Sequence, residues 1–208
     1  MASRLPTGID VLDRQLDGGL PAGSVIAYCA PPASQSELLL YELTRARQTL
    51  YLTLDRTQES VRDAFERTPA PTGEPTIRQV GADAPLENTR QLFRAIGGEA
   101  NLILDPSNRL ERSDRNRYEN FLNELANHMH NTGSVAVLHC LRDLDEPPLR
   151  GATEHIADVV LDLRVDTAGS EIETRLAVPK FRGGQALTET IKLELADRVR
   201  VDTSRDIA

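Results

Sequence analysis

The sequence predicts an α/β fold with a mostly parallel central sheet and helices on both faces. Over the first three quarters of the chain, short apolar runs alternate with segments of helical periodicity, and after Ala157 a period-two alternation takes over. Strands that alternate with helices require right-handed crossovers, which place helices on both sides of the sheet. The last segments should form antiparallel strands appended to that sheet.

The order of the elements follows from these patterns. In the first half we expect strands at 23–30, 49–55 and 76–80 and helices at 34–47, 58–67 and 87–96. In the second half we expect a strand at 101–105, a polar helix at 114–131 and strands at 134–140, 158–166, 171–181 and 188–197. In the first helix Leu38, Leu39 and Leu43 should face the core.

A single domain is expected over residues 1–208, because no repeat, low-complexity segment or linker divides the chain. Within it we expect a lead-in segment at 1–22, an α/β core at 23–157 and the antiparallel strands at 158–200. The 39% hydrophobic content is sufficient for one full core.

Composition narrows the function classes. Apolar runs are too short for a bilayer and the first ten residues lack the apolar region of a secretory signal, so we expect a cytoplasmic protein without membrane contact. The net charge is -8 and Lys180 and Lys192 are the only lysines, a balance that suits high salt. An acidic chain without tryptophan and with 4% aromatics is not a general nucleic-acid binder.

Three sequence segments carry a family resemblance. They are LPTGIDVLDRQLDGGLPAGSVIAYCAPPASQSELLL at 5–40, NLILD at 101–105, and ATEHIADVVLDL with LAVPKFRGG at 152–163 and 176–184. Together they resemble the RecA-like ATPases of the KaiC and archaeal RadA/RadB type, with a haloarchaeal character. The resemblance spans roughly residues 5 to 184 and implies the RecA-like P-loop NTPase fold, with Asp105 placed as in the second nucleotide motif.

The phosphate loop is where the sequence departs from that pattern. In active relatives this loop has the sequence Gly-x-x-x-x-Gly-Lys-Ser/Thr. Its backbone N–H groups surround the phosphates, and its Ser/Thr hydroxyl binds Mg²⁺. The resemblance places Ala30 and Gln35 at the glycines, Ser36 at the lysine and Glu37 at the metal-binding hydroxyl. A carboxylate about 4 Å from a phosphate oxygen costs roughly 4 kcal/mol at an effective dielectric near 20. We therefore expect no cofactor, with ATP and Mg²⁺ as the alternative.

Within this degenerate loop, after Ala33, the four residues from Ser34 to Glu37 have the Ser-x-x-Glu spacing of a capping box. Such a box would satisfy the helix amides that relatives reserve for phosphate. The alternative is that Glu37 points to solvent.

The candidate catalytic acids are also fewer than in the family pattern. The strand at 49–55 ends in Asp55 and Arg56, where the resemblance implies acidic residues that activate water, and arginine is no base near neutral pH. Asp55 and Asp105 are therefore vestigial candidates, and Asp105 could equally cap the turn after its strand.

Two groups of cations could serve partners. Lys180 and Arg182 match the Lys-x-Arg pair that, in assembled relatives, reaches a neighbour's terminal phosphate; alternatively they alternate on one face of an exposed strand. Recombinase relatives place a DNA-contacting loop where this chain carries Arg109, Arg112, Arg115 and Arg117. Carboxylates are interspersed there, which favours a salt-bridged helix start.

The two cysteines, Cys29 and Cys140, end strands that should lie side by side, with His139 adjacent. Buried thiols of this kind are usually core residues, and metal-ligand spacing is absent, so we expect no metal site.

The sequence thus predicts a catalytically degenerate RecA/KaiC-like protein, a pseudo-ATPase that acts as a regulatory or accessory subunit through protein contacts, with an active RecA-family relative as candidate partner. The alternative is a RadB-like DNA recombination or repair accessory that binds DNA or ATP weakly. An active ATPase with a rebuilt pocket is a third hypothesis.

Overall fold

The computed structural model describes residues 3–142, 145–168, 171–185 and 187–201; the ends of the predicted 1–208 domain lie outside this range. Its strands are β1 (Arg4–Leu5), β2 (Leu20–Pro21), β3 (Val25–Ala30), β4 (Thr49–Thr53), β5 (Thr76–Gln79), β6 (Asn101–Asp105), β7 (Val135–Leu141), β8 (Val159–Ala168), β9 (Glu171–Phe181), β10 (Ile191–Leu195) and β11 (Val199–Val201). Its helices are α1 (Asp10–Gln15), α2 (Glu37–Ala46), α3 (Gln58–Arg67), α4 (Pro85–Phe93), the 3-10 helix η1 (Ser107–Arg112), α5 (Arg115–Thr132) and α6 (Arg150–Ile156).

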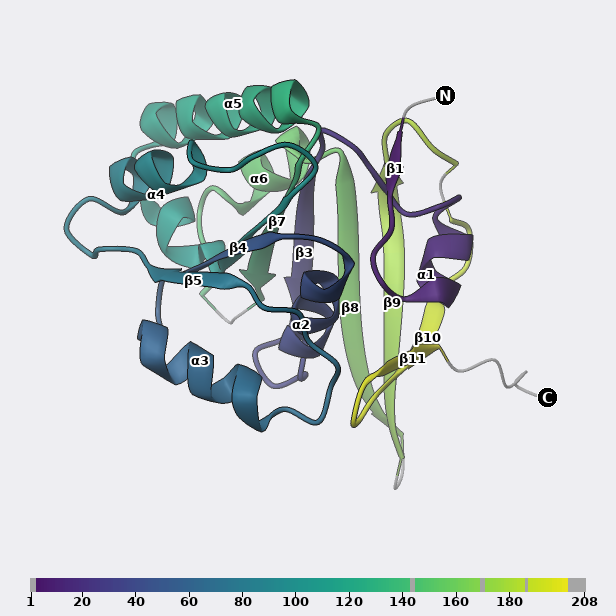
Figure 1. Cartoon of the computed structure of the whole chain (residues 1–208). Helices are drawn as coiled ribbons and strands as arrows, with labels where there is room; N and C mark the ends of the chain where they lie inside the picture. The colour runs from purple at the N-terminus through teal and green to yellow at the C-terminus, as the bar shows by residue number, and fades with distance from the viewer. Residues whose placement is uncertain (1–2, 143–144, 169–170, 186, 202–208) are drawn as a thin grey trace.

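A nine-stranded sheet organises the molecule, in the order β11-β10-β9-β8-β3-β7-β6-β4-β5 (Figure 1). The strands from β3 to β5 in this order are parallel, and β9, β10 and β11 are antiparallel to their neighbours. The predicted fold class is therefore confirmed. One detail differs: β8 runs parallel to β3 and antiparallel to β9, so it joins the two halves of the sheet.

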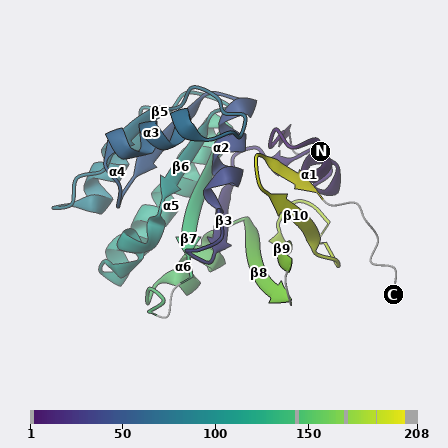
Figure 2. The same cartoon turned by 90° about the horizontal axis from the view of Figure 1, so that it is seen from below.

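Helices cover both faces of the sheet, with α2 and α3 on one side and α5 and α6 on the other (Figure 2). Successive residues of β3 point to opposite faces. Ile26 and Tyr28 join a core with α1 and α2, whereas Ala27 and Cys29 join a second core with α4 and α5. An almost wholly apolar β3 is therefore what a strand covered on both faces requires.

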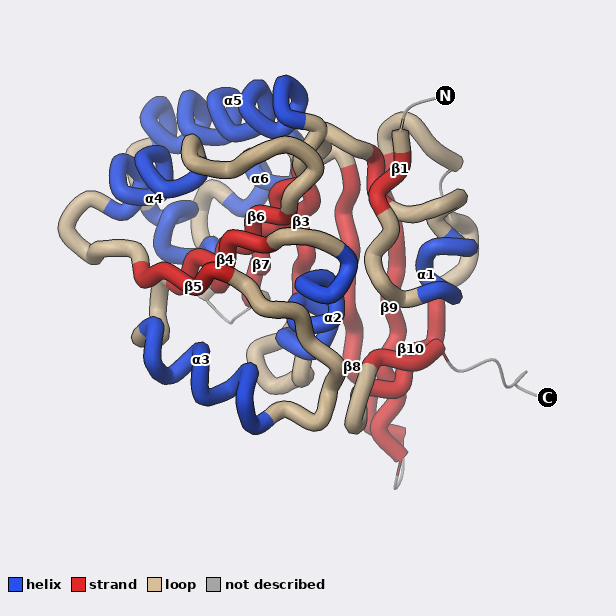
Figure 3. Tube along the Cα trace, in the orientation of Figure 1, coloured by secondary structure: helices blue, strands red, loops and turns tan. Residues whose placement is uncertain are grey.

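The lead-in segment is more structured than the sequence patterns predict. β1 and β2, which flank α1 in the sequence, form a small antiparallel pair. The carboxylate of Asp13 accepts hydrogen bonds from both the amide and the hydroxyl of Thr7 at 2.7 Å. Gly19 lies at φ +116, with Leu5 O only 2.3 Å from where a Cβ would sit. This Thr-Gly…Asp…Gly-Gly segment thus fixes the lead-in beside the C-terminal strands (Figure 3).

No helix in the described part of the chain is both long and apolar enough to cross a membrane.

Candidate functional site

The candidate site lies where β3, β6 and β7 end at the same edge of the sheet, because ligands of parallel α/β sheets bind at the carboxyl ends of the strands. The loop after Ala30 leads from β3 into α2 there, and Asp105 ends β6. The fold brings the degenerate loop and Asp105 together through a network of hydrogen bonds.

Gln35 in this loop has a backbone conformation that is typical of glycine. Gln35 has φ +49, in the left-handed region that glycine adopts most readily, although it carries a side chain. The side chain of Gln35 is exposed, whereas Ser34 and Ser36 on either side of it are buried.

The predicted capping box is wrong. The hydroxyl of Ser34 donates to Pro31 O at 2.5 Å within the loop, which directs it away from the start of the helix. α2 begins at Glu37, and the residue before it, Ser36, has helical dihedrals and no side-chain cap hydrogen bond. Glu37 is instead half-exposed and lines an open hollow of about 300 Å³.

The hydroxyl of Ser36 is part of a hydrogen-bonded series of three side chains, which come from the loop before α2, from β7 and from β6. Ser36 Oγ lies 3.0 Å from His139 Nε2, and His139 Nδ1 lies 2.6 Å from Asp105 Oδ1. All three residues are buried, with exposed fractions of 2%, 3% and 4% respectively. Tyr28 packs against the imidazole at 5.4 Å between ring centroids and donates its hydroxyl to Ser36 O at 3.1 Å.

Asp105 accepts hydrogen bonds on both carboxylate oxygens. One oxygen takes the contact with His139, and the other accepts from the Tyr51 hydroxyl and from the Arg56 guanidinium, at 2.9 Å for the latter. Burial raises the pKa of Asp105, but the hydrogen bonds and charges of these partners, led by His139, lower it by a larger amount. The pKa of Asp105 is therefore about 2. Asp105 is therefore a carboxylate at neutral pH, and its oxygens are already occupied by protein donors.

The ionised state of Asp105 fixes the protonation of its neighbours. A carboxylate can only accept, so His139 Nδ1 carries a proton. When the imidazole is neutral, Nε2 accepts the hydrogen bond from the Ser36 hydroxyl. In that form the hydrogen bonds run from Ser36 through His139 to Asp105.

Asp55, the other acid that the sequence suggested as a vestigial candidate, is not part of this network. It is exposed and forms an ion pair with Arg109 at 3.2 Å. The residue after it, Arg56, turns inward to Asp105 instead.

The four arginines of the predicted DNA loop are all exposed and all paired with carboxylates, as the salt-bridged interpretation predicts. The pairs are Arg109–Asp55, Arg112–Asp145, Arg115–Glu119 and Arg117–Glu87.

The two cations of the predicted finger cap a helix within the same chain. Lys180 Nζ donates to the carbonyls of Glu154 and His155 at 2.8 and 2.7 Å, and Arg182 donates to His155 O at 3.0 Å. These carbonyls lie in the last turn of α6, where positive charge is stabilising. Their reach to a neighbouring subunit stays a prediction.

Cys29 and Cys140 are register partners on β3 and β7, so the predicted proximity is confirmed. Both are fully buried free thiols, and burial raises the pKa of Cys140. Beside Cys140 lies a buried ion pair that the sequence did not reveal: Arg150 donates to Glu111 through Nη2 at 2.7 Å and Nε at 2.9 Å. Among the described residues no group of three or more His, Cys, Asp or Glu side chains could hold a metal ion.

The fold and the position of the site define the class of protein. A structure of a KaiC-like protein from the hyperthermophilic archaeon Pyrococcus horikoshii OT3 matches this chain with a TM-score of 0.78 at 15% identity, covering 97% of this chain and 100% of that one. The chain therefore has the RecA-like fold of KaiC-like proteins, which is the fold that the sequence resemblance implies.

Within this class, residues 4–208 match the model of a family of unknown function, DUF7125, and the chain belongs to that family. None of the curated proteins matches the sequence.

Proposed function

We propose that this chain is a pseudo-ATPase, a RecA-like protein that no longer hydrolyses ATP and acts as a regulatory or accessory subunit through protein contacts. The observation that carries the proposal is the hydrogen-bonded chain from Ser36 through His139 to Asp105. In the family pattern the positions of Ser36 and Asp105 face phosphate and metal, and here both side chains bind His139. We place the protein in a salt-adapted cytoplasm, on the strength of its acidic, lysine-poor composition.

The residues present do not fit Mg²⁺ and a triphosphate. A metal at Asp105 would have to displace Arg56 or His139, and the loop supplies the carboxylate of Glu37 where relatives supply a hydroxyl. A phosphate on the loop would meet that carboxylate without a lysine to offset it. The proposed function therefore does not include ATP hydrolysis by this chain.

The test of this proposal is nucleotide binding. We expect the melting temperature of the full chain in molar KCl to stay constant, within about 1 °C, from zero to 5 mM Mg-ATP, while a relative with an intact phosphate loop is stabilised under the same conditions. A saturable rise of several degrees would contradict the proposal.

The candidate partner is an active RecA-family relative that presents ATP to Lys180 and Arg182. To reach a neighbour these side chains would leave the terminal carbonyls of α6. Arg182 is exposed and Lys180 is half-buried, so the loss of these hydrogen bonds to water should cost little. Substitution of both by methionine should lower the hydrolysis that the chain stimulates in such a relative. Unchanged hydrolysis would remove the finger from the proposal.

The second candidate function, a RadB-like DNA accessory, is favoured by the clustering of Arg109, Arg112, Arg115 and Arg117. Each of these cations already has a carboxylate partner, which reduces the net positive charge a phosphate backbone would meet. Fluorescence anisotropy with a labelled single strand separates the two functions. Binding that weakens steeply with salt would favour the DNA accessory.

A further inference from the structure

We propose that Ser36 is an activated nucleophile for acyl transfer, served by His139 as general base and Asp105 as its orienting carboxylate, with small carboxylic esters as the substrate class. The proposal goes beyond the pseudo-ATPase function, because it assigns another chemistry to the same residues. It is based on three observations: the geometry of the three side chains, the position of Ser36 at a helix start, and the hollows beside it.

The geometry is that of a nucleophile, a base and an orienting group. Ser36 Oγ and His139 Nε2 are within hydrogen-bond distance at 3.0 Å, and Asp105 Oδ1 holds Nδ1 at 2.6 Å. Such a constellation is recognised by its roles, whatever the order of its members in the chain. Asp105 fixes the tautomer that leaves Nε2 free to accept the hydroxyl proton, which is the arrangement a general base requires.

Ser36 directly precedes α2, a ten-residue helix. The positive end of the helix dipole therefore lies next to Oγ, where it stabilises negative charge that develops on a reacting carbonyl oxygen. The three members come from the loop after β3 and from the ends of β6 and β7, so the sheet holds them rigidly.

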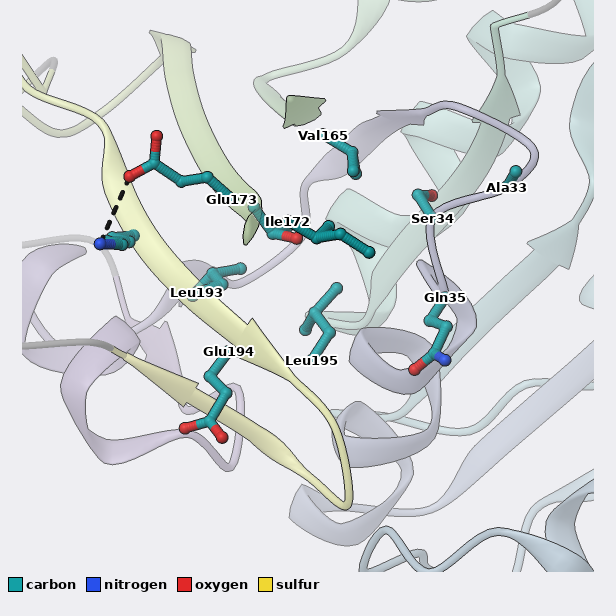
Figure 4. Close-up of a pocket in the computed structure, with 11 residues that line it drawn as sticks. Ala33, Ser34, Gln35, Val165, Ile172, Glu173, Leu193, Glu194 and Leu195 are labelled. Atoms are coloured by element: carbon teal, nitrogen blue, oxygen red, sulfur yellow. Dashed lines mark ion pairs between the residues drawn. The ribbon is translucent and has the colours of Figure 1, made fainter. Parts of the chain in front are cut away.

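Two hollows lie next to Ser36 in the sequence of the loop. Ser36 itself is 2% exposed and lines neither of them, whereas its neighbour Gln35 lines both. One, of about 540 Å³, is lined by the loop and by apolar residues of the C-terminal strands, including Val165, Leu193 and Leu195; the other, of about 300 Å³, is the one that Glu37 lines. Gln35 lines the larger hollow (Figure 4) and the smaller one as well, and its left-handed backbone is one that glycine adopts without strain.

The reaction balances without a redox partner. Ser36 Oγ forms a bond to the ester carbonyl carbon while its proton passes to His139 Nε2. The bond from that carbon to the leaving alkoxide then breaks, and His139 returns the proton to the alkoxide as an alcohol. Water repeats the same path on the acyl-serine and releases the carboxylic acid.

A fluorophosphonate probe tests the nucleophile on the full chain in molar KCl. The probe forms an Oγ–P bond and loses fluoride, so peptide mapping by mass spectrometry reports the labelled serine. We expect labelling at Ser36, its loss in Ser36→Ala, and unchanged labelling in Ser24→Ala. Ser24 is the matched control because it is a buried serine outside both hollows whose hydroxyl bonds a carbonyl instead of an imidazole.

Two further variants separate activation from packing. Asp105→Asn keeps the shape of the side chain but favours the wrong tautomer, so the labelling rate should fall about 10³ to 10⁴-fold in protein that circular dichroism shows to be folded. Gln35→Gly should raise the rate about tenfold, because it shortens the cover and relieves the left-handed backbone. Absence of Ser36 labelling in both the wild type and Gln35→Gly would overturn the proposal and leave the network as a buried structural contact.

Discussion

Removal of the Asp105 charge should destabilise the protein at neutral pH and much less in acid. The pKa of Asp105 lies at about 2 in the folded protein against an ordinary value of 3.8, and the side chain is 6% exposed. A difference of this size corresponds to about 2 to 3 kcal/mol of folding stability. Because the folded pKa is the lower one, this contribution is complete above about pH 4 to 5 and is lost as the pH falls toward 2.

Asp105→Asn should therefore lower the free energy of unfolding by about 2 to 3 kcal/mol at pH 7, as measured by urea denaturation at constant salt. The difference between wild type and variant should narrow progressively between pH 4 and pH 2. Asp63→Asn is the control, because its ion pair with Arg67 lies at the surface and should contribute less than about 1 kcal/mol at any pH. An Asp105→Asn difference that stayed constant from pH 7 to pH 2.5 would refute the assigned hydrogen bonding.

Three other perturbations have defined outcomes. Arg150→Met leaves the carboxylate of Glu111 buried without its cation and should cost about 3 to 5 kcal/mol in urea denaturation, whereas Arg115→Met, at an exposed pair, should cost less than about 1; equal costs would contradict the buried pair. Gly19→Ala places a Cβ against Leu5 O in a left-handed backbone and should lower stability by at least about 1 to 3 kcal/mol, so an unchanged melting temperature would exclude this close approach. Raising KCl from 0.1 to 2 M should raise the melting temperature, because it screens the repulsion of a chain with net charge -8; a flat salt profile would argue against salt adaptation.

The elements that the sequence predicts best are those with strong internal periodicity. The helix at 58–67 and the strands at 101–105 and 171–181 have their predicted bounds. The strands β1, β2 and β11 have only two or three residues each, and such short strands form only when they pair with another strand. Their local patterns were too short to show a period.

The candidate site was predictable in part, for a related reason. The resemblance placed Asp105 and the degenerate loop at one edge of the sheet, which is where they lie. His139 was expected only as a neighbour of Cys140, because its contact with Ser36 spans 103 positions of the chain. A signal was nevertheless present: a serine before a helix, a histidine near the end of one strand and an aspartate at the end of the next. Strand order converts that pattern into a contact only when β6 and β7 are known to be neighbours.

Under the proposed pseudo-ATPase function, loss of the phosphate site would involve more than the loop itself. With Ser36 at the lysine position a cation is missing and with Glu37 at the hydroxyl position an anion is added, but both changes leave Asp105 in place. Asp105 would then be a buried carboxylate without a metal, which is costly unless donors surround it. Arg56 and His139, with Tyr51, supply those donors. The loop and the two strand ends therefore form one interdependent arrangement, in which Ser36 binds His139 and His139, Arg56 and Tyr51 satisfy the carboxylate of Asp105.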